Sequence, residues 1–240
     1  MADTGGIRRT VDRLGYGLKT RVAAVPSVAL PFSRLRGRGE PVGPDTELVI
    51  ESFPRCASSF AVAAFRLAQE PRAMRIANHT HMPAQVLEAA KRGIPAMVLL
   101  REPEGAVLSH LIHTPALTVE DSLHGFLRFY EPLRHARDGF VVGTFEEATR
   151  DLGVVIDRLN ARFGTGFARF EHTPKNLERL NREIETDYRL RAGSEEELER
   201  IIPRPSEARE AMKARLRGDY AHAPEALRRR ALAVYEALLP

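Results

Sequence analysis

Three short stretches of this sequence hold the residues best suited to chemistry: 54–58 (PRCAS), 79–83 (HTHMP) and 101–104 (REPE). Each follows a run of residues that predicts a buried strand and precedes a run that predicts a helix. In a parallel sheet, ligands bind beyond the carboxyl ends of the strands. We therefore expect these three loops to contribute to one site.

The first stretch indicates an anion site. The N–H groups of a strand-to-helix turn converge, and the helix N-terminus adds partial positive charge. Arg55 adds a full charge, and the hydroxyls of Ser58 and Ser59 are hydrogen-bond donors that could also cap the helix. The stretch lacks the G-x-x-x-x-G-K-S/T pattern and its lysine, which disfavours ATP hydrolysis. The structural alternative is an ordinary turn capped by serine.

Histidines are the candidate bases. His79 and His81 follow the second predicted strand, and an imidazole titrates near neutral pH. The two could ligate a metal, but no third ligand stands near them in the sequence, so we expect no metal site. His110 and His113 lie in the helix after the third loop and are candidates for lining an acceptor pocket.

The predicted elements define the fold class. Strand and helix alternate from residue 47 to 163, which predicts an α/β fold with a parallel sheet and helices on both faces, similar to P-loop NTPases. From about residue 174 the pattern is helical and charged, which predicts a helical C-terminal extension. The predicted strands are 47–53, 74–78, 94–100 and 140–145, and the predicted helices are 58–69, 83–92, 103–113, 118–137 and 146–163.

Composition limits the class of protein. The 240 residues suit one elaborated domain better than two. The formal net charge of +4 and the excess of Arg over Lys favour an anionic ligand or surface over a long nucleic acid. The single cysteine, Cys56, excludes an internal disulfide framework. With no apolar run of about 18 residues and no signal-peptide pattern, we expect a cytoplasmic protein.

The N-terminal 46 residues read differently from the rest. Prolines and glycines over 26–46 predict a loop or linker, so we divide the chain into an arm and linker, 1–46, and a single domain, 47–240. Residues 7–38 mix Arg and Lys with Leu, Val and Phe. We favour a solvated, partly disordered arm, and the alternative is peripheral contact with an anionic membrane surface.

The stretch 54–60 (PRCASSF) resembles the phosphosulfate-binding loop of sulfotransferases, P-K/R-S-G-T/S-T/S-W/F/L. Those enzymes use 3'-phosphoadenosine-5'-phosphosulfate (PAPS) and release adenosine 3',5'-bisphosphate (PAP). The sequence departs from the pattern where the family has Ser and Gly, and because alanine avoids positive φ we expect a slightly altered turn. The resemblance implies that the loop holds the 5'-phosphosulfate through Arg55, Cys56, Ala57, Ser58 and Ser59.

Two further motifs follow in the family's order. Residues 80–83 (THMP) resemble the K-T-H-L-P segment, which places His81 on the family's catalytic base and His79 on its lysine. Residues 101–109 resemble R-N/D-P-x-D/E-x-x-x-S, which implies that Arg101 and Ser109 hold the 3'-phosphate. Arg101 ends a predicted strand and Ser109 lies about two helical turns into the next helix, so the spacing is physically reasonable.

Weaker similarity covers the rest of the domain. Residues 141–147 (VVGTFEE) look like the strand ending in Y-E-D, and the resemblance implies that Phe60 and Phe145 flank the adenine. Residues 204–206 (RPS), with Arg209 and Lys213, resemble a C-terminal segment of bacterial members. The family's R-K-G segment is not found. The candidates for its role at the 3'-phosphate are Arg204 and Arg217.

These observations predict a sulfotransferase that moves a sulfuryl group from PAPS to a hydroxyl or amine. His81 would be the general base, and Arg55 would stabilise the leaving phosphate. His79 would share the sulfuryl charge if protonated, or serve as the base if the register is two residues off. The acceptor could be a small molecule, a glycan or a lipid. The alternatives are a P-loop kinase or other ATP-using transferase, and a non-catalytic module that binds anions or membrane surfaces.

Overall fold

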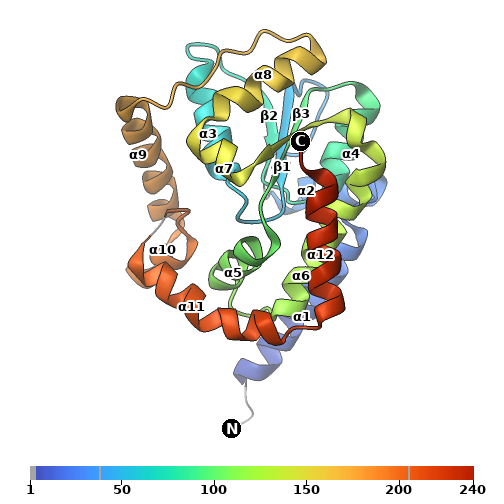
Figure 1. Cartoon of the computed structure of the whole chain (residues 1–240), viewed down its shortest axis with the longest axis vertical. Coiled ribbons are helices and arrows are strands. Elements are labelled where there is room, and N and C mark those ends of the chain that lie inside the picture. Colours follow the sequence, from blue (N-terminus) through green and yellow to red (C-terminus); the bar gives the residue numbers. More distant parts are fainter. Residues whose placement is uncertain (1–3, 38, 205) are drawn as a thin grey trace.

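Four short apolar runs form one parallel sheet in the order β2-β1-β3-β4 (Figure 1). The computed structural model describes residues 4–37, 39–204 and 206–240. Every residue of β1 and β3 is buried, because central parallel strands are covered on both faces. Ile50 of β1 pairs with Asn78 on one side and Met97 on the other. The strands are β1 (Leu48–Ser52), β2 (Ile76–Asn78), β3 (Ala96–Leu100) and β4 (Val141–Thr144).

Helices cover both faces of this sheet (Figure 1). One face carries α3 (Ser58–Ala68), α7 (Phe145–Arg150) and α8 (Leu152–Phe163). The other carries α4 (Pro83–Arg92), which packs against the 3-10 helix η1 (Glu131–Gly139). The α/β class predicted from the strand–helix alternation is confirmed.

Two predicted helices are divided in the structure. The range 118–137 is α6 (Val119–Tyr130) followed by η1, which has a proline in its first turn. The range 146–163 is divided at Asp151 into α7 and α8. Helix α7 starts directly after β4, because Thr144 and Glu147 form a reciprocal capping box.

The prediction of a loop over residues 26–46 is wrong for its first half. Residues 26–36 form α2 (Pro26–Arg36), and Pro26 fits the first helical position, where its missing N–H has no partner to lose. The helix buries Ala29, Leu30 and Ser33 and packs against α4. Tertiary burial of this face therefore outweighs the local turn signals.

The segment before α2 is also ordered, contrary to the expected partly disordered arm. It forms α1 (Thr4–Val22), which lies along α6. Arg13 Nε donates to Asp121 Oδ2 at 2.6 Å, and Arg128 Nη1 donates to Thr20 Oγ1 at 2.8 Å. These contacts hold one side of α1 against the body of the protein.

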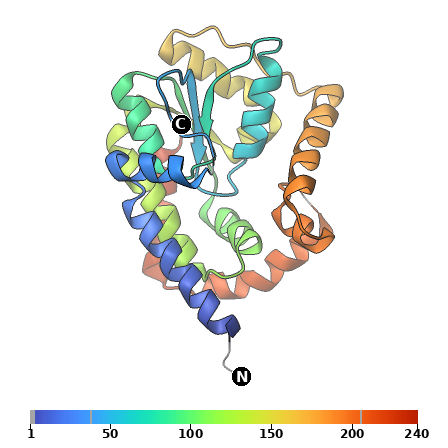
Figure 2. The same ribbon diagram turned by 180° about the vertical axis from the view of Figure 1, so that it is seen from behind.

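The C-terminal third is helical, as predicted, and curves around the carboxyl edge of the sheet (Figures 1 and 2). Helix α9 packs beside α3, α11 crosses α5 (Pro103–His113), and α12 lies along α6. Among the helices of the described residues, none has both the length and the apolar character needed to cross a bilayer. The elements are α9 (Pro174–Arg191), α10 (Glu195–Ile201), α11 (Glu207–His222) and α12 (Glu225–Leu238).

Candidate functional site

A cavity of about 1530 Å³ lies beyond the carboxyl edge of the sheet, and all three predicted loops line it. It exceeds the roughly 300–1,000 Å³ of typical small-molecule pockets, so it has room for two ligands. In the sheet, β2 lies on one side of β1 and β3 on the other, so successive connections leave β1 and β3 in opposite directions. Ligands of such sheets bind at this point, and the loops after β1 and β3 both line the cavity there. The basic residues that line the cavity outnumber the acidic ones by six to three: Lys19, Arg55, Arg101, Arg204, Arg209 and Lys213, against Asp12, Glu185 and Glu210.

The turn after β1 is strained. Ala57 is the N-cap of α3 and has φ 69°, the left-handed conformation that its type was expected to avoid, and Arg55 also has φ 69°. Each such residue costs roughly 1–2 kcal/mol, and such strain is concentrated at functional sites. Neither Ser58 nor Ser59 caps the helix, contrary to expectation.

Cys56 stands between these two left-handed residues, and its side chain is fully buried in the core. Its Sγ lies 3.6 Å from the Tyr130 hydroxyl and 3.8 Å from the Pro54 carbonyl oxygen. Burial raises the pKa of the Cys56 thiol to about 11, so it stays neutral. Cys56 is not part of the cavity lining, so its expected contact with the phosphosulfate is not supported.

The turn presents free donors to the cavity. In the described part of the chain, no hydrogen bond satisfies the backbone N–H of Ser58, Ser59 or Phe60. These are orphan groups of a helix N-terminus, which an anion can satisfy. The anion-binding turn predicted from the sequence is therefore geometrically present, with the peptide groups as its donors.

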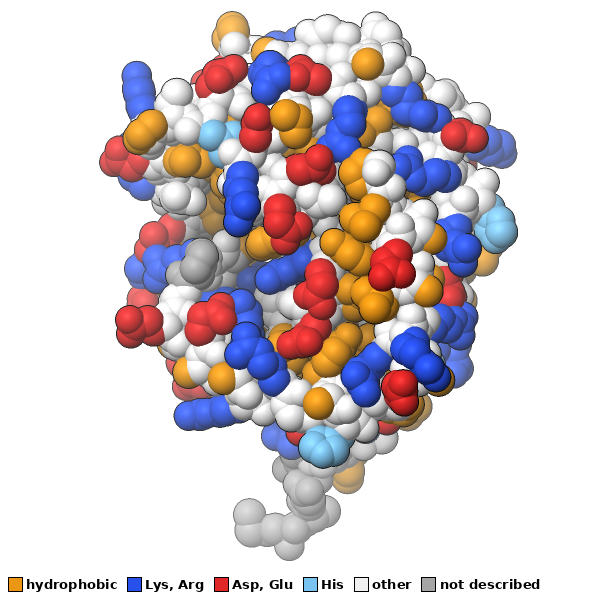
Figure 3. Space-filling model, in the orientation of Figure 1, with side chains coloured by type: hydrophobic (Ala, Val, Ile, Leu, Met, Phe, Trp, Pro, Cys, Tyr) orange, Lys and Arg blue, Asp and Glu red, His pale blue; other side chains and the backbone are white. Residues whose placement is uncertain are grey.

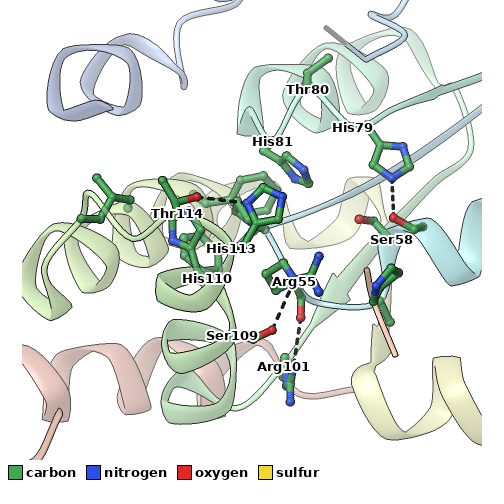
Figure 4. A pocket seen from close by; sticks show the side chains of 18 of the residues that line it. Arg55, Ser58, His79, Thr80, His81, Arg101, Ser109, His110, His113 and Thr114 are labelled. Atoms are coloured by element: carbon green, nitrogen blue, oxygen red, sulfur yellow. Dashed lines mark hydrogen bonds between the residues drawn. The ribbon is translucent and has the colours of Figure 1, made fainter. Parts of the chain in front are cut away.

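Three guanidinium groups, those of Arg55, Arg101 and Arg209, lie beside this turn. Figure 4 shows Arg55 and Arg101 next to Ser109. Arg55 Nε and Arg209 Nη2 each donate to Ser109 Oγ at 3.3 Å, and Arg101 Nη1 donates to the Arg55 carbonyl oxygen at 3.1 Å. In the described chain, none of the three has a carboxylate oxygen within 4.0 Å. Burial, followed by repulsion from Arg209, lowers the pKa of Arg55 to about 10. Buried cations without counter-charges are costly, so this cluster is suited to an anion.

Arg55 is oriented differently from the expectation. Its Nη1 and Nη2 donate to the carbonyl oxygens of Ile201 and Ile202 at the end of α10, at 2.7 and 3.2 Å. The Arg55 side chain thus joins Ser109 to the end of α10, while the Arg55 carbonyl oxygen accepts from Arg101. No local signal predicts this contact, because α10 is about 150 residues away along the chain.

The three basic C-terminal candidates differ in their distance from the cavity and in their partners. Arg209 is only 3% exposed and belongs to the arginine cluster, although the sequence placed it only in a weak resemblance. Arg204 lines the cavity but pairs with Glu185 at 3.3 Å. Arg217 does not line the cavity and lies 3.7 Å from Glu104 on the surface, so its expected role at the 3'-phosphate is not supported. Pro205 lies outside the described residues.

The two predicted adenine-flanking aromatics both line the cavity. The guanidinium carbon of Arg101 lies 4.0 Å from the ring centroid of Phe145. Phe60 stacks on His172 with a centroid separation of 5.9 Å. Each ring is thus held by a neighbour, which pre-organises it for stacking.

His79 belongs to a hydrogen-bond chain. Its Nδ1 contacts Asn78 Oδ1. The Asn78 amide nitrogen donates to the Ile76 carbonyl oxygen, so Asn78 Oδ1 is an acceptor and His79 Nδ1 carries the proton. His79 Nε2 then accepts from Ser59 Oγ at 3.2 Å, and Ser59 is also 2.8 Å from the Tyr188 hydroxyl. Burial lowers the pKa of His79 to about 4, so it is neutral. It therefore does not supply the positive charge that its position suggested.

His81 presents a free ring nitrogen. Its Nδ1 donates to the Ser52 carbonyl oxygen at 2.9 Å, which leaves Nε2 as the lone-pair nitrogen. No atom of the described chain hydrogen-bonds to Nε2, and the ring lines the cavity (Figure 4). Burial lowers the pKa of His81 to about 4.

A buried carboxylate holds the His81 loop in place. Glu51 is fully buried and accepts hydrogen bonds from the backbone N–H groups of Thr80 and His81, at 2.7 and 3.1 Å. Gln85 Nε2 also donates to it at 2.8 Å. These contacts hold His81 at φ 52° and aim its ring into the cavity.

The other two candidate histidines also line the cavity. His110 is buried, contacts Ser122 Oγ through Nδ1 at 2.9 Å, and packs edge-on against Phe53. His113 contacts Thr114 Oγ1 at 3.1 Å. Within the described residues, no three His, Cys, Asp or Glu side chains gather as a metal site would require.

Comparison with known proteins gives little beyond this geometry. No protein-family model and no curated protein matches the chain. A solved structure of mouse sulfotransferase SULT7A1 complexed with PAP is similar at 11% sequence identity and a TM-score of 0.40, over 79% of this chain and 90% of that chain. The functional conclusions rest on the site itself.

Proposed function

We propose that this protein is a PAPS-dependent sulfotransferase acting on a hydroxyl acceptor with an apolar body. One observation carries the proposal: a cluster of three arginines without carboxylate partners lines the same cavity as a neutral histidine with a free Nε2. Arg55 and Arg209 both donate to Ser109, and Arg101 donates to the Arg55 carbonyl oxygen. The first feature suits a multiply charged anion, and the second suits removal of a proton from an acceptor.

The cationic end of the cavity fits the nucleotide. Arg101, Arg209 and Ser109 would hold the 3'-phosphate, in agreement with the resemblance of residues 101–109. The free N–H groups of Ser58 and Ser59 would hold the 5'-phosphosulfate. Bound PAPS supplies the sulfuryl group and a phosphate leaving group. The protein contributes position and charge stabilisation, as enzymes do in the related phosphoryl transfer.

His81 is the better base of the two candidates. Its Nε2 is free, whereas the Nε2 of His79 already accepts from Ser59. His81 would take the acceptor proton as the acceptor oxygen attacks. A bound anion would raise the pKa of His81 from about 4 towards neutrality and strengthen it as a base.

The opposite end of the cavity is apolar and fits the acceptor. It lies between α1, α2 and the helices after the third loop, beyond His81. An acceptor with a hydrocarbon or aromatic body would bury that body here and present its hydroxyl to His81. The apolar lining residues are Leu18, Val22, Val28, Phe32, Leu117 and Phe129.

Thermal shift with PAP tests the proposal, with ATP and AMP as controls. A ligand that binds only the native state stabilises it by about 2.7 kcal/mol at a hundredfold excess over Kd. We expect a shift with PAP that exceeds both controls, followed by sulfuryl transfer to phenols or long-chain alcohols. A larger shift with ATP would instead favour an ATP-using transferase, and PAP binding without turnover on any acceptor would favour the non-catalytic module.

A further inference from the structure

An exposed apolar ridge runs along α1. It consists of Ile7, Val11, Leu14 and Leu18, which are 61–69% exposed and share one helical face at the spacing i, i+4, i+7, i+11. Among the described residues, ten large hydrophobic side chains are exposed, and seven of them lie between residues 7 and 35. A patch concentrated in this way marks an interaction site.

The same helix carries the net charge of the protein. Helix α1 has five basic residues and one acidic residue, a net charge of +4, whereas the whole chain has 36 basic and 32 acidic. The rest of the chain is therefore balanced at 31 each. Figure 3 shows this balance on one face, where acidic and basic side chains are interspersed over α9 to α12. The described chain offers no ion-pair partner to Arg8, Arg9 or Arg21.

We propose that α1 docks on an anionic membrane surface through this ridge. A helix with an apolar ridge, flanking arginines and low overall hydrophobicity is the pattern that lies in a lipid interface. Anionic headgroups would pair with Arg8 and Arg21, which flank the ridge on either side, while the four apolar side chains enter the acyl boundary.

The structure disfavours two other occupants. An acidic protein that wraps around a basic helix needs access from several sides, but α1 is fixed to α6 through Arg13 and Arg128, and Tyr16 packs against Gly125. A second copy of this chain would place the unpaired arginines of one α1 near those of the other, and like charges repel. A flat anionic surface avoids both problems.

Docking would place the cavity mouth at the membrane. Val11 and Leu18 belong to the ridge and also line the cavity, as does the exposed Val28 of α2. Figure 2 shows α1 and α2 together on the outside of the molecule. An amphiphile held in that membrane could then reach the apolar end of the cavity without crossing water. This consequence rests on the proposed function, whereas the docking itself does not.

Vesicle flotation of the full-length protein tests the docking independently of catalysis. We expect binding to phosphatidylcholine vesicles that contain phosphatidylglycerol and much weaker binding to phosphatidylcholine alone. Leu14→Glu should reduce partitioning at least about tenfold, because it replaces a leucine that would enter the acyl boundary with a negative charge. Arg8→Ala should reduce it about fivefold. Neither residue lines the cavity, so PAP binding should be unchanged.

The matched control is Leu190→Glu, the same change at a leucine that is 84% exposed on α9. It should partition like the wild type, and thermal midpoints would verify that all variants fold. Three results would overturn the proposal: no preference for anionic vesicles, equal partitioning of Leu14→Glu and the wild type, or a wild-type dimer that Leu14→Glu converts to a monomer. The last would identify the ridge as an interface between copies of the chain.

Discussion

Replacing Arg101 with alanine should weaken nucleotide binding strongly and lower the free energy of unfolding only slightly. In the described chain Arg101 has no carboxylate partner, and its only hydrogen bond runs from Nη1 to the Arg55 carbonyl oxygen. The guanidinium has five N–H donors, so most remain available to a phosphate. Its contact with the Phe145 ring is already made without a ligand, so we expect it to contribute to stability more than to affinity.

The size of the effect follows from the interaction that is lost. A hydrogen bond to a charged group contributes about 1.5–3 kcal/mol. Arg101→Ala should therefore weaken PAP binding by roughly 10- to 150-fold. Loss of the contact with Phe145 should cost on the order of 0.5–1 kcal/mol of unfolding free energy.

Isothermal titration calorimetry with PAP would measure the change in Kd. The matched control is Arg217→Ala, which removes the same charge from the same protein. Arg217 lies outside the cavity and is 3.7 Å from Glu104, so this variant should bind PAP within about twofold of the wild type, as surface ion pairs contribute little.

Two results would refute this reasoning. Equal affinity of Arg101→Ala and the wild type would remove Arg101 from the binding site and with it the assignment of the arginine cluster. Equal weakening by Arg101→Ala and Arg217→Ala would show that only the overall charge matters and that the cavity has no specific phosphate site.

The remaining predictions concern histidines. His81→Ala should lower kcat by about 10²–10⁴ and change Kd for PAP less than twofold, because the base touches the acceptor; unchanged turnover would exclude the role. In the wild type, kcat/KM should fall as the pH drops through about 4, where His81 of the unliganded enzyme becomes protonated. The same pH profile in His81→Ala would contradict this. Burial lowers the pKa of His110 to about 3, well below the 6.5 of an unfolded chain. As the pH drops below 6.5, the unfolded state binds a proton that the folded state does not, so the free energy of unfolding decreases as the pH decreases. His110→Phe should therefore lose on the order of 1–2 kcal/mol less than the wild type between pH 7.5 and 5 in urea melts; equal losses would show that other groups dominate.

Much of the fold could be read from the sequence. The apolar runs before 54, 79 and 101 predicted the strands, and Pro83, Gly93 and Pro103 marked helix ends that the structure confirms. These signals are local, because a strand or a helix end is specified by neighbouring residues. The N-terminal helices were missed because Pro26 and the following prolines and glycines are turn signals, whereas burial against α4 and α6 decides the outcome.

The candidate site was predictable only in part. The sequence indicated the turn at 54–58, the pair Arg101 and Ser109, and the two histidines after β2. The resemblance favoured His81 over His79 as the base, but the physical difference between them is tertiary. Ser59 occupies Nε2 of His79, whereas the Ser52 carbonyl holds Nδ1 of His81 and leaves its Nε2 free.

The sequence by itself determined which residue types stand at the strand ends, and hence which loops would meet at the carboxyl edge of a parallel sheet. Only the tertiary structure decided that Arg209 joins Arg55 and Arg101, and that Arg217 does not. The reason is physical: backbone elements follow from local chemistry, whereas an arginine more than 100 residues away enters the site through the packing of α11 on α5. The packing of α1 on α6 likewise brings the apolar ridge of α1 to the cavity, which Val11 and Leu18 line.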